Sequence, residues 1–323
     1  MRSMERVLIL GWPLKPQAWL DEYPSVEVAR IYLENLGYLQ KRSKTFSFHA
    51  PRFLRRFEKF SPRYWLGEWK DRIKEFDFVI LIDEVRGSDV FDFILEKNPN
   101  CRICVFYDSS IPAGSLKEPT NYSGYPVKFY SCDRKIVQDY GIEFMPYFYI
   151  FSPVGFSAYN TLETVAVERD VFFVGEEKGD RLERLEEITR VMKNMNLKYD
   201  FRLVGKRHDW YWRKRKHSLS SYLPYDVILR LVRSSRAILE LISDGQTGIT
   251  QRTYEALFFR KKLITNSAEV KSYEFYHEQN VFILGERSLD ELVTFLESPV
   301  CPVEEGLQKY TFQGWLKRFD VEI

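Results

Sequence analysis

The sequence predicts an α/β protein of two Rossmann-like domains that face a cleft, and three observations lead to this prediction. Short apolar runs alternate with amphipathic stretches, and the runs at 6–13 and 76–83 end at glycine, proline or aspartate. A proline-bearing stretch at 144–168 interrupts the alternation, which starts afresh at Arg169. The length of 323 residues suits two domains of ordinary size.

The expected boundaries follow from this interruption. We expect a first domain at 1–150, a second at 151–306, and an amphipathic C-terminal helix at 307–323 that packs back on the first domain. Short connections between the alternating elements predict a parallel sheet in each domain.

Each element is justified by its local pattern. In the first domain, 6–13 reads as a strand, and the apolar positions after Ser25 predict a helix that ends near Gly37. Further strands are expected at 76–83, 102–107 and 128–131, and helices at 90–95 and 134–140. In the second domain we expect strands at 169–175, 199–204, 237–241, 262–265 and 281–284, and helices at 181–195, 224–233, 250–260 and 289–296.

The stretch 241–257 carries the strongest local signal for a ligand. A buried strand gives way to a polar loop with two glycines, and a helix begins at Thr250, a residue type that caps helix N-termini. The unpaired N–H groups and the dipole of such a helix start favour an anion. Arg252 and Glu255 stand in its first turns and could hold a diphosphate and a ribose.

Composition indicates which classes of protein the sequence does not favour. The formal net charge of +2 does not by itself indicate a nucleic-acid partner, and no apolar run approaches the roughly 20 residues that span a bilayer. No signal peptide is visible, so we expect a cytoplasmic protein. Cys101 and Cys104 lie within an apolar strand and are interpreted as core residues rather than metal ligands.

Segment 41–74 interleaves eleven basic residues with aromatic and apolar ones. One interpretation is a surface that touches anionic lipid headgroups or a lipid-diphosphate acceptor at the inner membrane face. The other is an ordinary amphipathic helix pair with a solvated basic face. Nucleic acid is a third reading, and we do not expect it as a partner because nothing elsewhere supports it.

Several motifs resemble a known class of enzymes. The arrangement resembles the GT-B glycosyltransferases, and the second half is similar to bacterial glycosyltransferases of lipopolysaccharide or capsule biosynthesis. The resemblance covers mainly the stretch between 125 and 297. In the second half its residues are 170–175, 237–240, 246–250, 252–257, 261–266 and 273–276, and Ser131, Asp133, 140–141 and 146–149 resemble the end of the first domain of such proteins.

The resemblance implies a nucleotide-sugar donor, UDP- or GDP-linked, in the second domain and a glycan or lipid-linked acceptor in the first. It places Glu255 on the donor ribose and implies no resident cofactor and no bound metal. The chain lacks the full Glu-x7-Glu pattern of one large retaining group, so retention and inversion both stay open.

Metal-free glycosyl transfer needs cations and N–H groups at the leaving diphosphate. Arg252 is the first candidate, and its competing role is a surface pair with Glu255. The full set of expected donor contacts is Gly175, Lys178, Arg181, Lys206, Gln246, Thr247, Gly248, Thr250, Arg252 and Glu255.

An inverting enzyme also needs a base for the acceptor hydroxyl. Asp83, Asp108 and Asp133 follow three expected strands of the first domain, and each could instead cap the next helix. Two other functions compete with glycosyl transfer: a sugar-nucleotide epimerase of the same fold, and a binding or assembly protein without catalysis.

Overall fold

The computed structural model divides the chain into two compact units. Unit 1 comprises Met1–Tyr147 and Trp315–Ile323, and unit 2 comprises Phe148–Gly314. The chain thus passes from unit 1 to unit 2 within three residues of position 150. The structure describes residues 4–12, 21–50, 54, 57, 61–149, 165–204, 218–219, 223–242, 248–303 and 306–321.

Unit 1 is built on a six-stranded, wholly parallel sheet in the order β2-β1-β3-β4-β5-β6. The strands are β1 (Val7–Leu10), β2 (Val26–Ala29), β3 (Phe78–Ile82), β4 (Arg102–Tyr107), β5 (Val127–Ser131) and β6 (Glu143–Phe144). The α-helices are α2 (Tyr38–His49), α3 (Asp89–Lys97) and α4 (Arg134–Tyr140), and the 3-10 segments are η2 (Pro62–Trp65), η3 (Glu68–Glu75) and η4 (Pro119–Tyr122).

One predicted element of unit 1 is wrong. The helix expected after Ser25 is instead the edge strand β2, which pairs with β1 in parallel register from Val26 against Val7. Burial alternates along β2, with Val26 and Val28 inside and Glu27 toward solvent. This period of two is the strand signal, and β-branched valines favour it over a helix.

In the described part of the basic segment 41–74, the helix pair of one interpretation is not seen as two α-helices. This part holds the end of α2 and the two 3-10 segments η2 and η3. Trp65, Trp69 and Ile73 point into the core, whereas Phe46 and Phe57 are exposed. The segment therefore contributes its tryptophans to the fold and leaves phenylalanines on the surface.

The C-terminal residues cover one face of the unit 1 sheet, as predicted. Trp315 packs edge-on against Phe106 at 5.3 Å between ring centroids. Phe319 makes similar contacts with Phe78 at 5.4 Å and with Tyr130 at 5.2 Å. The other face packs against α3 through a cluster that includes Val79, Leu81, Ile103, Val105, Val90, Phe91 and Ile94.

Unit 2 has a second six-stranded parallel sheet, in the order β12-β11-β10-β7-β8-β9. Its strands are β7 (Arg169–Glu176), β8 (Tyr199–Val204), β9 (Ser218–Leu219), β10 (Ser235–Glu240), β11 (Lys262–Thr265) and β12 (Val281–Ile283). Its helices are α5 (Arg181–Asn194), α6 (Tyr225–Arg233), α7 (Gln251–Phe258) and α8 (Leu292–Glu297), with 3-10 segments η7 (Ala268–Ser272), η8 (Leu289–Glu291) and η9 (Leu307–Tyr310), and α9 (Phe312–Lys317) follows.

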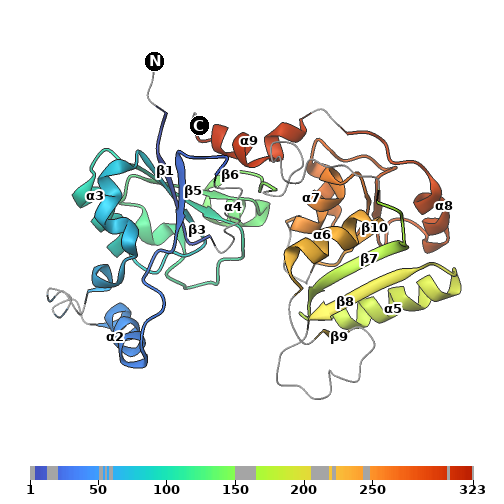
Figure 1. The fold of residues 1–323 in the computed structure, drawn as a ribbon, viewed down its shortest axis with the longest axis horizontal. Helices are drawn as coiled ribbons and strands as arrows, with labels where there is room; N and C mark the ends of the chain where they lie inside the picture. Colours follow the sequence, from blue (N-terminus) through green and yellow to red (C-terminus); the bar gives the residue numbers. More distant parts are fainter. Residues whose placement is uncertain are drawn as a thin grey trace. The chain divides into compact units, whose positions relative to one another are not determined.

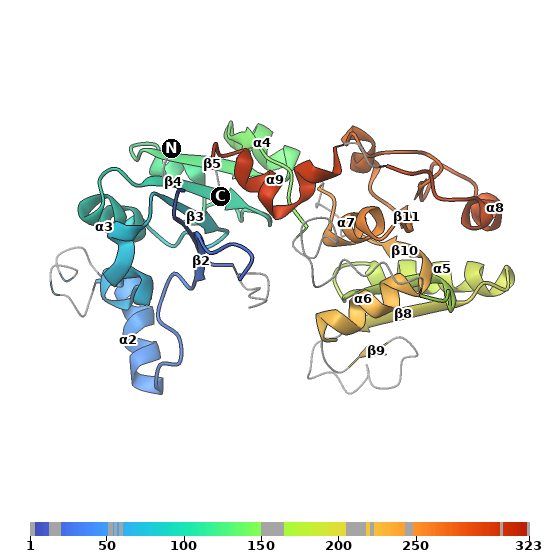
Figure 2. The same ribbon diagram turned by 45° about the horizontal axis from the view of Figure 1, so that its top comes forward.

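Helices cover both faces of this sheet. Figures 1 and 2 show α5 alongside β8, whereas α6 and α7 lie against β10. Along β10, Ala237 and Leu239 belong to the core cluster that contains α5 residues. Because successive side chains of a strand alternate in direction, Ile238 and Glu240 point to the opposite face, where Glu240 meets α7.

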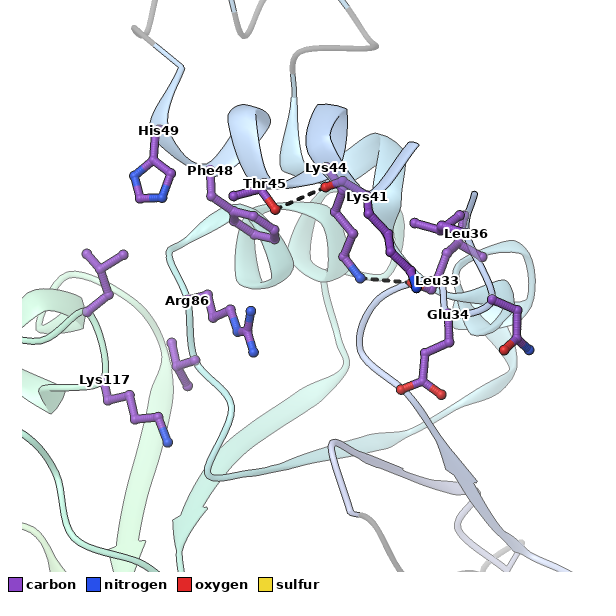
Figure 3. Close-up of a pocket in the computed structure, with 13 residues that line it drawn as sticks. Leu33, Glu34, Leu36, Lys41, Lys44, Thr45, Phe48, His49, Arg86 and Lys117 are labelled. Atoms are coloured by element: carbon purple, nitrogen blue, oxygen red, sulfur yellow. Dashed lines mark hydrogen bonds between the residues drawn. The ribbon is translucent and has the colours of Figure 1, made fainter. Parts of the chain in front are cut away.

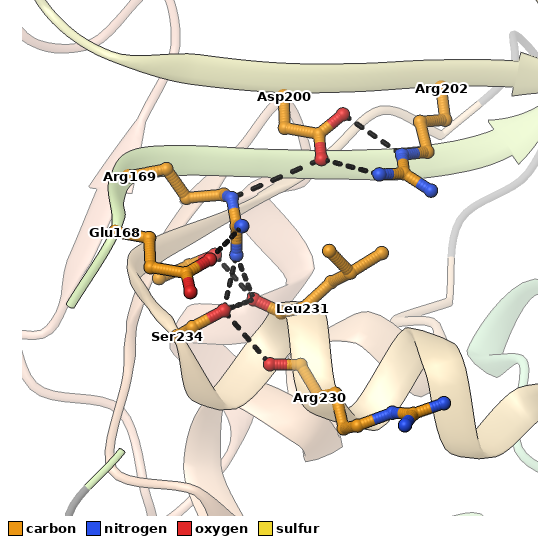
Figure 4. A network of polar contacts seen from close by, with 8 residues as sticks. Glu168, Arg169, Asp200, Arg202, Arg230, Leu231 and Ser234 are labelled. Carbon is orange, nitrogen blue, oxygen red and sulfur yellow. Dashed lines mark hydrogen bonds and ion pairs between the residues drawn. The ribbon is translucent and has the colours of Figure 1, made fainter. Parts of the chain in front are cut away.

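A polar network ties the amino-terminal edge of the unit 2 sheet together (Figure 4). Arg169, the first residue of β7, donates to the Leu231 carbonyl at 3.1 Å and to the Ser234 hydroxyl. Its guanidinium also lies 3.9 Å from Asp200 on β8, which pairs with Arg202 at 2.9 Å. This edge is opposite to the one at which parallel sheets bind ligands, so the network serves the fold.

Candidate functional site

The order of the strands in unit 2 defines where a ligand crevice opens. The chain builds β8 and β9 on one side of β7, then crosses to build β10, β11 and β12 on the other. At such a reversal, the connections that leave the two central strands run in opposite directions. The space between them, at the carboxyl ends of these strands, is where α/β folds bind ligands. The switch point of unit 2 therefore lies at Glu176 and Glu240, the last residues of β7 and β10.

Glu240 is the buried anchor of this edge. It is 1% exposed, and its Oε1 accepts from the Thr250 backbone N–H at 3.0 Å and from the Thr250 hydroxyl at 2.6 Å. The hydroxyl of Thr253 donates to the same oxygen at 2.9 Å, and that of Thr265 donates to Oε2 at 2.7 Å. One carboxylate thus fixes the start of α7 to β10 and β11.

Sequence reasoning missed Glu240 as a site residue. The available signal was a carboxylate that ends an apolar strand, because a buried charge needs partners. The partners stand 10, 13 and 25 positions further along the chain, so only the folded chain brings them to it.

Thr250 caps α7 as predicted. Its backbone is extended, with φ −107° and ψ 176°, and its Oγ1 accepts from the Arg252 N–H at 3.1 Å. Asn266 holds the other end of the preceding loop: its amide oxygen accepts from the Ile242 N–H at 2.8 Å, and its amide nitrogen donates to the Ile242 carbonyl at 3.0 Å. Ile242 and Thr250, the described residues on either side of 243–247, are thus both fixed by side-chain hydrogen bonds.

Arg252 and Glu255 form an ion pair inside unit 2. The Glu255 side chain has no exposed surface, and that of Arg252 is 18% exposed. Glu255 also accepts from the Tyr225 hydroxyl at 2.6 Å, and Tyr225 in turn lies within 2.9 Å of Gln251 and of Tyr149. Desolvation lowers the pKa of Arg252, but Glu255, Tyr225 and Tyr149 together raise it above its ordinary value, so the guanidinium stays charged.

This burial bears directly on the roles expected for the pair. Of the two roles predicted for Arg252, the contact with Glu255 at i+3 is the one observed, although it is buried rather than on the surface. Glu255 offers no accessible oxygen to a ribose in this structure, because Tyr225 and Arg252 occupy both. The ribose role of Glu255 therefore stays a prediction that requires these contacts to open.

Replacing Glu255 with alanine is expected to lower the free energy of unfolding by about 2–3 kcal/mol, because Arg252 keeps its charge in a buried place without a partner. Urea denaturation followed by circular dichroism measures the change. Asp226→Ala is the control, since it removes an exposed helical ion pair with Arg230 and should cost under about 0.5 kcal/mol. Equal effects of the two substitutions would refute a structural role for Glu255.

Arg181, at the start of α5, reaches back over the end of β7. It donates to the Glu176 carbonyl at 2.5 Å, and a side chain at Gly175 would meet its guanidinium at 3.5 Å. Burial lowers the pKa of Arg181, and the carboxylates of Glu176, Asp180 and Glu240 act in the opposite direction. Arg181 is thus a half-buried cation at the switch point.

The remaining expected donor contacts fall into two groups. Lys178 is exposed and pairs with Glu176 at 3.1 Å, whereas Gly248 is buried just before α7. Lys206, Gln246 and Thr247 lie outside the described residues. Across the described part of the chain, no group of three His, Cys, Asp or Glu side chains has the arrangement of a metal site.

Unit 1 has its own switch point, between β1 and β3, because β2 lies on one side of β1 and all later strands lie on the other. Gly11 ends β1 with φ +87°, and a side chain there would come within 2.7 Å of the Ile82 carbonyl. Only glycine allows the two strand ends to approach this closely. Asp83 follows β3 at this point.

Asp83 and Asp108 form a carboxyl pair at this edge. Asp83 adopts a left-handed backbone conformation, with φ +56°. Its carboxylate accepts from the Asp108 N–H at 3.1 Å, the Ser109 N–H at 3.3 Å and the Ser109 hydroxyl. Asp83 is thereby committed to holding the chain that follows β4.

The pKa of Asp108 is raised well above its ordinary value by desolvation and by the hydrogen bond and charge of Asp83, while Lys117 acts in the opposite direction. Desolvation is the largest of these causes, and the hydrogen bond and charge of Asp83 act in the same direction. Asp133 differs from both, since it caps α4 and accepts from the N–H groups of Lys135 and Ile136. The structure thus brings two of the three expected base candidates together and leaves the third in a capping role.

Neither a protein-family model nor a curated protein sequence matches the chain. Two solved structures of an alpha-glucosyltransferase are similar over almost its whole length. One, in complex with UDP and a 13-mer DNA containing a central A:G mismatch, has a TM-score of 0.54 and 8% identity, and covers 98% of both chains. The other, with UDP and a 13-mer DNA containing an HMU base, has a TM-score of 0.50 and 9% identity, and covers 98% of this chain and 99% of that one.

The chain has the GT-B fold. At such low identity the likeness establishes the arrangement of two parallel α/β sheets and nothing about chemistry, which has to be argued from the site. The GT-B fold of this chain contains two switch points. The unit 2 switch point holds Arg181 and the start of α7, and the unit 1 switch point holds the carboxyl pair.

Proposed function

We propose that this protein is a glycosyltransferase that moves a sugar from a nucleotide-sugar donor to an acceptor hydroxyl. The observation that carries the proposal is the pair of switch points in a GT-B chain. One has a half-buried arginine beside a helix start, which suits a diphosphate, and the other has a carboxyl group of raised pKa, which suits a base.

In this proposal the donor binds at the β7/β10 edge of unit 2. The leaving diphosphate gains negative charge as the glycosidic bond breaks, and a cation that already sits in a partly desolvated place stabilises it without rearrangement. Arg181 meets this requirement by its place, because it reaches back over the end of β7 to the Glu176 carbonyl, whereas Arg252 lies inside unit 2 against Glu255. UDP and GDP remain the two expected leaving groups, and no metal is needed.

The donor site predicts a binding result that separates the arginine from its neighbour. Isothermal titration with UDP-, GDP-, CMP- and dTDP-sugars should find one class that binds, and Arg181→Gln should weaken that binding about 10- to 100-fold through loss of a charge-assisted contact. Lys178→Gln removes the same charge from an exposed neighbour and should change the affinity less than threefold. If Arg181→Gln binds the donor as tightly as the unchanged protein does, this donor site is wrong. If no nucleotide-sugar binds to the protein, the proposed function is wrong.

For the acceptor we propose a glycan or lipid-linked sugar of bacterial surface polysaccharide synthesis, as the resemblance of segment 125–297 implies. Exposed Tyr38, Leu39 and Phe46 on α2, with the cation Arg42 among them, support contact with an anionic membrane surface. No helix in the described ranges is long and apolar enough to cross a bilayer. The two compared structures contain DNA, so nucleic acid enters as a competing acceptor.

The two alternative functions make different products. An epimerase would convert the donor sugar without an acceptor, and a binding protein would leave the donor intact. Incubation of the bound donor with and without acceptor, followed by analysis of the released nucleotide and sugar, distinguishes all three. Acceptor-dependent release of the nucleoside diphosphate is the outcome expected for transfer.

A further inference from the structure

A hollow of about 770 Å³ in unit 1 collects cations from three separate segments of the chain. Lys41 and Lys44 come from α2, Arg86 from the connection after β3, and Lys117 from the loop before η4. Figure 3 shows Arg86 between the α2 side chains and Lys117 in this view. We call this hollow the cationic pocket.

Among the described residues, few carboxylates offset the charges of the cationic pocket. Within the described part of the chain, Lys41, Arg86 and Lys117 make no ion pair. Of the described residues that line the pocket, Glu34 is the one carboxylate, and Arg30 already pairs with it at 3.3 Å. Several cations held together without counter-charges favour binding of an anion.

Lys44 is subject to charge repulsion in this pocket. Its Nζ donates to the Leu33 carbonyl at 2.8 Å, which fixes the ammonium at the pocket wall. Burial lowers the pKa of Lys44, the Arg86 charge lowers it further, and Glu34 and Glu84 act in the opposite direction. An anion in the pocket would relieve the repulsion between Lys44 and Arg86.

Lys117 links the cationic pocket to the carboxyl pair. Lys117 lines the pocket and is close enough to Asp108 to oppose the rise of its pKa. Its backbone is held in place, since its carbonyl accepts from the buried Tyr107 hydroxyl at 2.5 Å. Phe48, Val85 and Leu116 add apolar wall beside the cations. A ligand that fits has an anionic group next to a less polar body.

We propose that the cationic pocket binds a phosphate group of the acceptor and so brings the acceptor hydroxyl to Asp108. The inference rests on the proposed function and adds to it the substrate class: the acceptor is a phosphorylated sugar, either free or lipid-linked. Arg86 supplies a planar fork for two phosphate oxygens, and Lys41, Lys44 and Lys117 supply point charges.

The test uses inorganic pyrophosphate as the probe, in the presence of a saturating amount of UDP or GDP, whichever the donor titration selects, so that the donor site is occupied. Arg86→Gln and Lys117→Gln should each weaken pyrophosphate binding at least tenfold. Lys128→Gln, an exposed lysine of β5 outside the pocket, is the matched control and should change binding less than twofold. Equal affinity of all four proteins would overturn the proposal while leaving the donor titration of Arg181→Gln intact.

Two further probes identify the source of the phosphate. Phosphatidylcholine vesicles that contain phosphatidic acid should retain the protein in a sedimentation assay if the acceptor is lipid-linked, and Arg86→Gln should release it. Pocket-dependent binding of pyrophosphate without vesicle binding supports a free phosphorylated sugar. A single-stranded 13-mer oligonucleotide that binds more tightly than either, with a steep loss on added salt, would overturn the proposal in favour of nucleic acid.

Discussion

Replacing Glu240 with alanine is expected to lower the free energy of unfolding of unit 2 by about 3–5 kcal/mol, because several donors lose their only carboxylate. The Thr250 N–H and the hydroxyls of Thr250, Thr253 and Thr265 all converge on Glu240. Hydroxyl groups can turn toward other acceptors, but the Thr250 N–H cannot. The start of α7 should therefore detach from β10 and β11.

Amide hydrogen exchange measures this effect where it occurs. Protection should fall in α7, β10 and β11, and the unit 1 strands should keep theirs. Glu286→Ala is the control, since that carboxylate makes an exposed pair with Lys271 and its loss should cost under about 1 kcal/mol. If both variants unfold at the same urea concentration, Glu240 does not anchor the site.

Glu240→Ala should also lose the ability to bind the donor. A helix start presents its N–H groups to a diphosphate only when the helix is held in place, and Glu240 is the residue that holds α7 to the sheet. Glu240→Gln should give an intermediate result, because the amide keeps one acceptor oxygen and turns the other position into a donor.

Replacing Asp108 with asparagine is expected to reduce kcat by 10²- to 10⁴-fold, the usual contribution of a general base. Asparagine keeps the size of the side chain and cannot take a proton. Steady-state kinetics with the donor found by titration checks the prediction. Asp133→Asn is the matched control: asparagine also caps helices well, so α4 and the rate should both be retained.

The pH dependence of Asp108 has a definite sign. Its folded pKa is raised well above the ordinary aspartate value of about 3.9, so activity should fall as pH decreases through that raised pKa. Asp83→Asn removes the neighbouring charge and should move this acidic limb to lower pH. If the fall of activity at low pH occurs at the same pH in Asp83→Asn, Asp83 does not raise the pKa of Asp108.

The same shift predicts a gain in stability for the inactive variant. A carboxyl group with a raised folded pKa binds its proton more tightly in the folded state, so it destabilises the fold once pH exceeds the unfolded pKa. Asp108→Asn should therefore raise Tm at neutral pH, and the gain should vanish below about pH 4. A loss of Tm at neutral pH would instead assign Asp108 a structural role.

Most of the secondary structure followed from local patterns. The apolar runs of β3 and β4 and the exact span of β11 were predicted because buried parallel strands are continuous in apolar residues. The exception is β2, where four residues of alternating burial were read as the start of a helix. So short a segment at a sheet edge offers little periodicity from which to choose.

The helix cap at Thr250 and the carboxylates that follow β3 and β4 were also visible in the sequence, since each depends on near neighbours. The contacts that these residues make in the folded protein could not be predicted from the sequence. Arg252 and Glu255 looked like surface groups at a ligand site, and the folded chain buries them as a pair with Tyr225.

By itself, the sequence determined the fold class, the alternation of strands and helices, and the position of most strands to within a few residues. Tertiary structure alone decided which strand ends are neighbours. That choice made β7/β10 and β1/β3 the switch points, gathered three threonines on Glu240, and collected Lys41, Arg86 and Lys117 in one pocket. The local pattern of apolar residues indicates whether a residue is buried. Which strand lies beside it depends on the order of the strands in the sheet, and the local pattern does not contain that order.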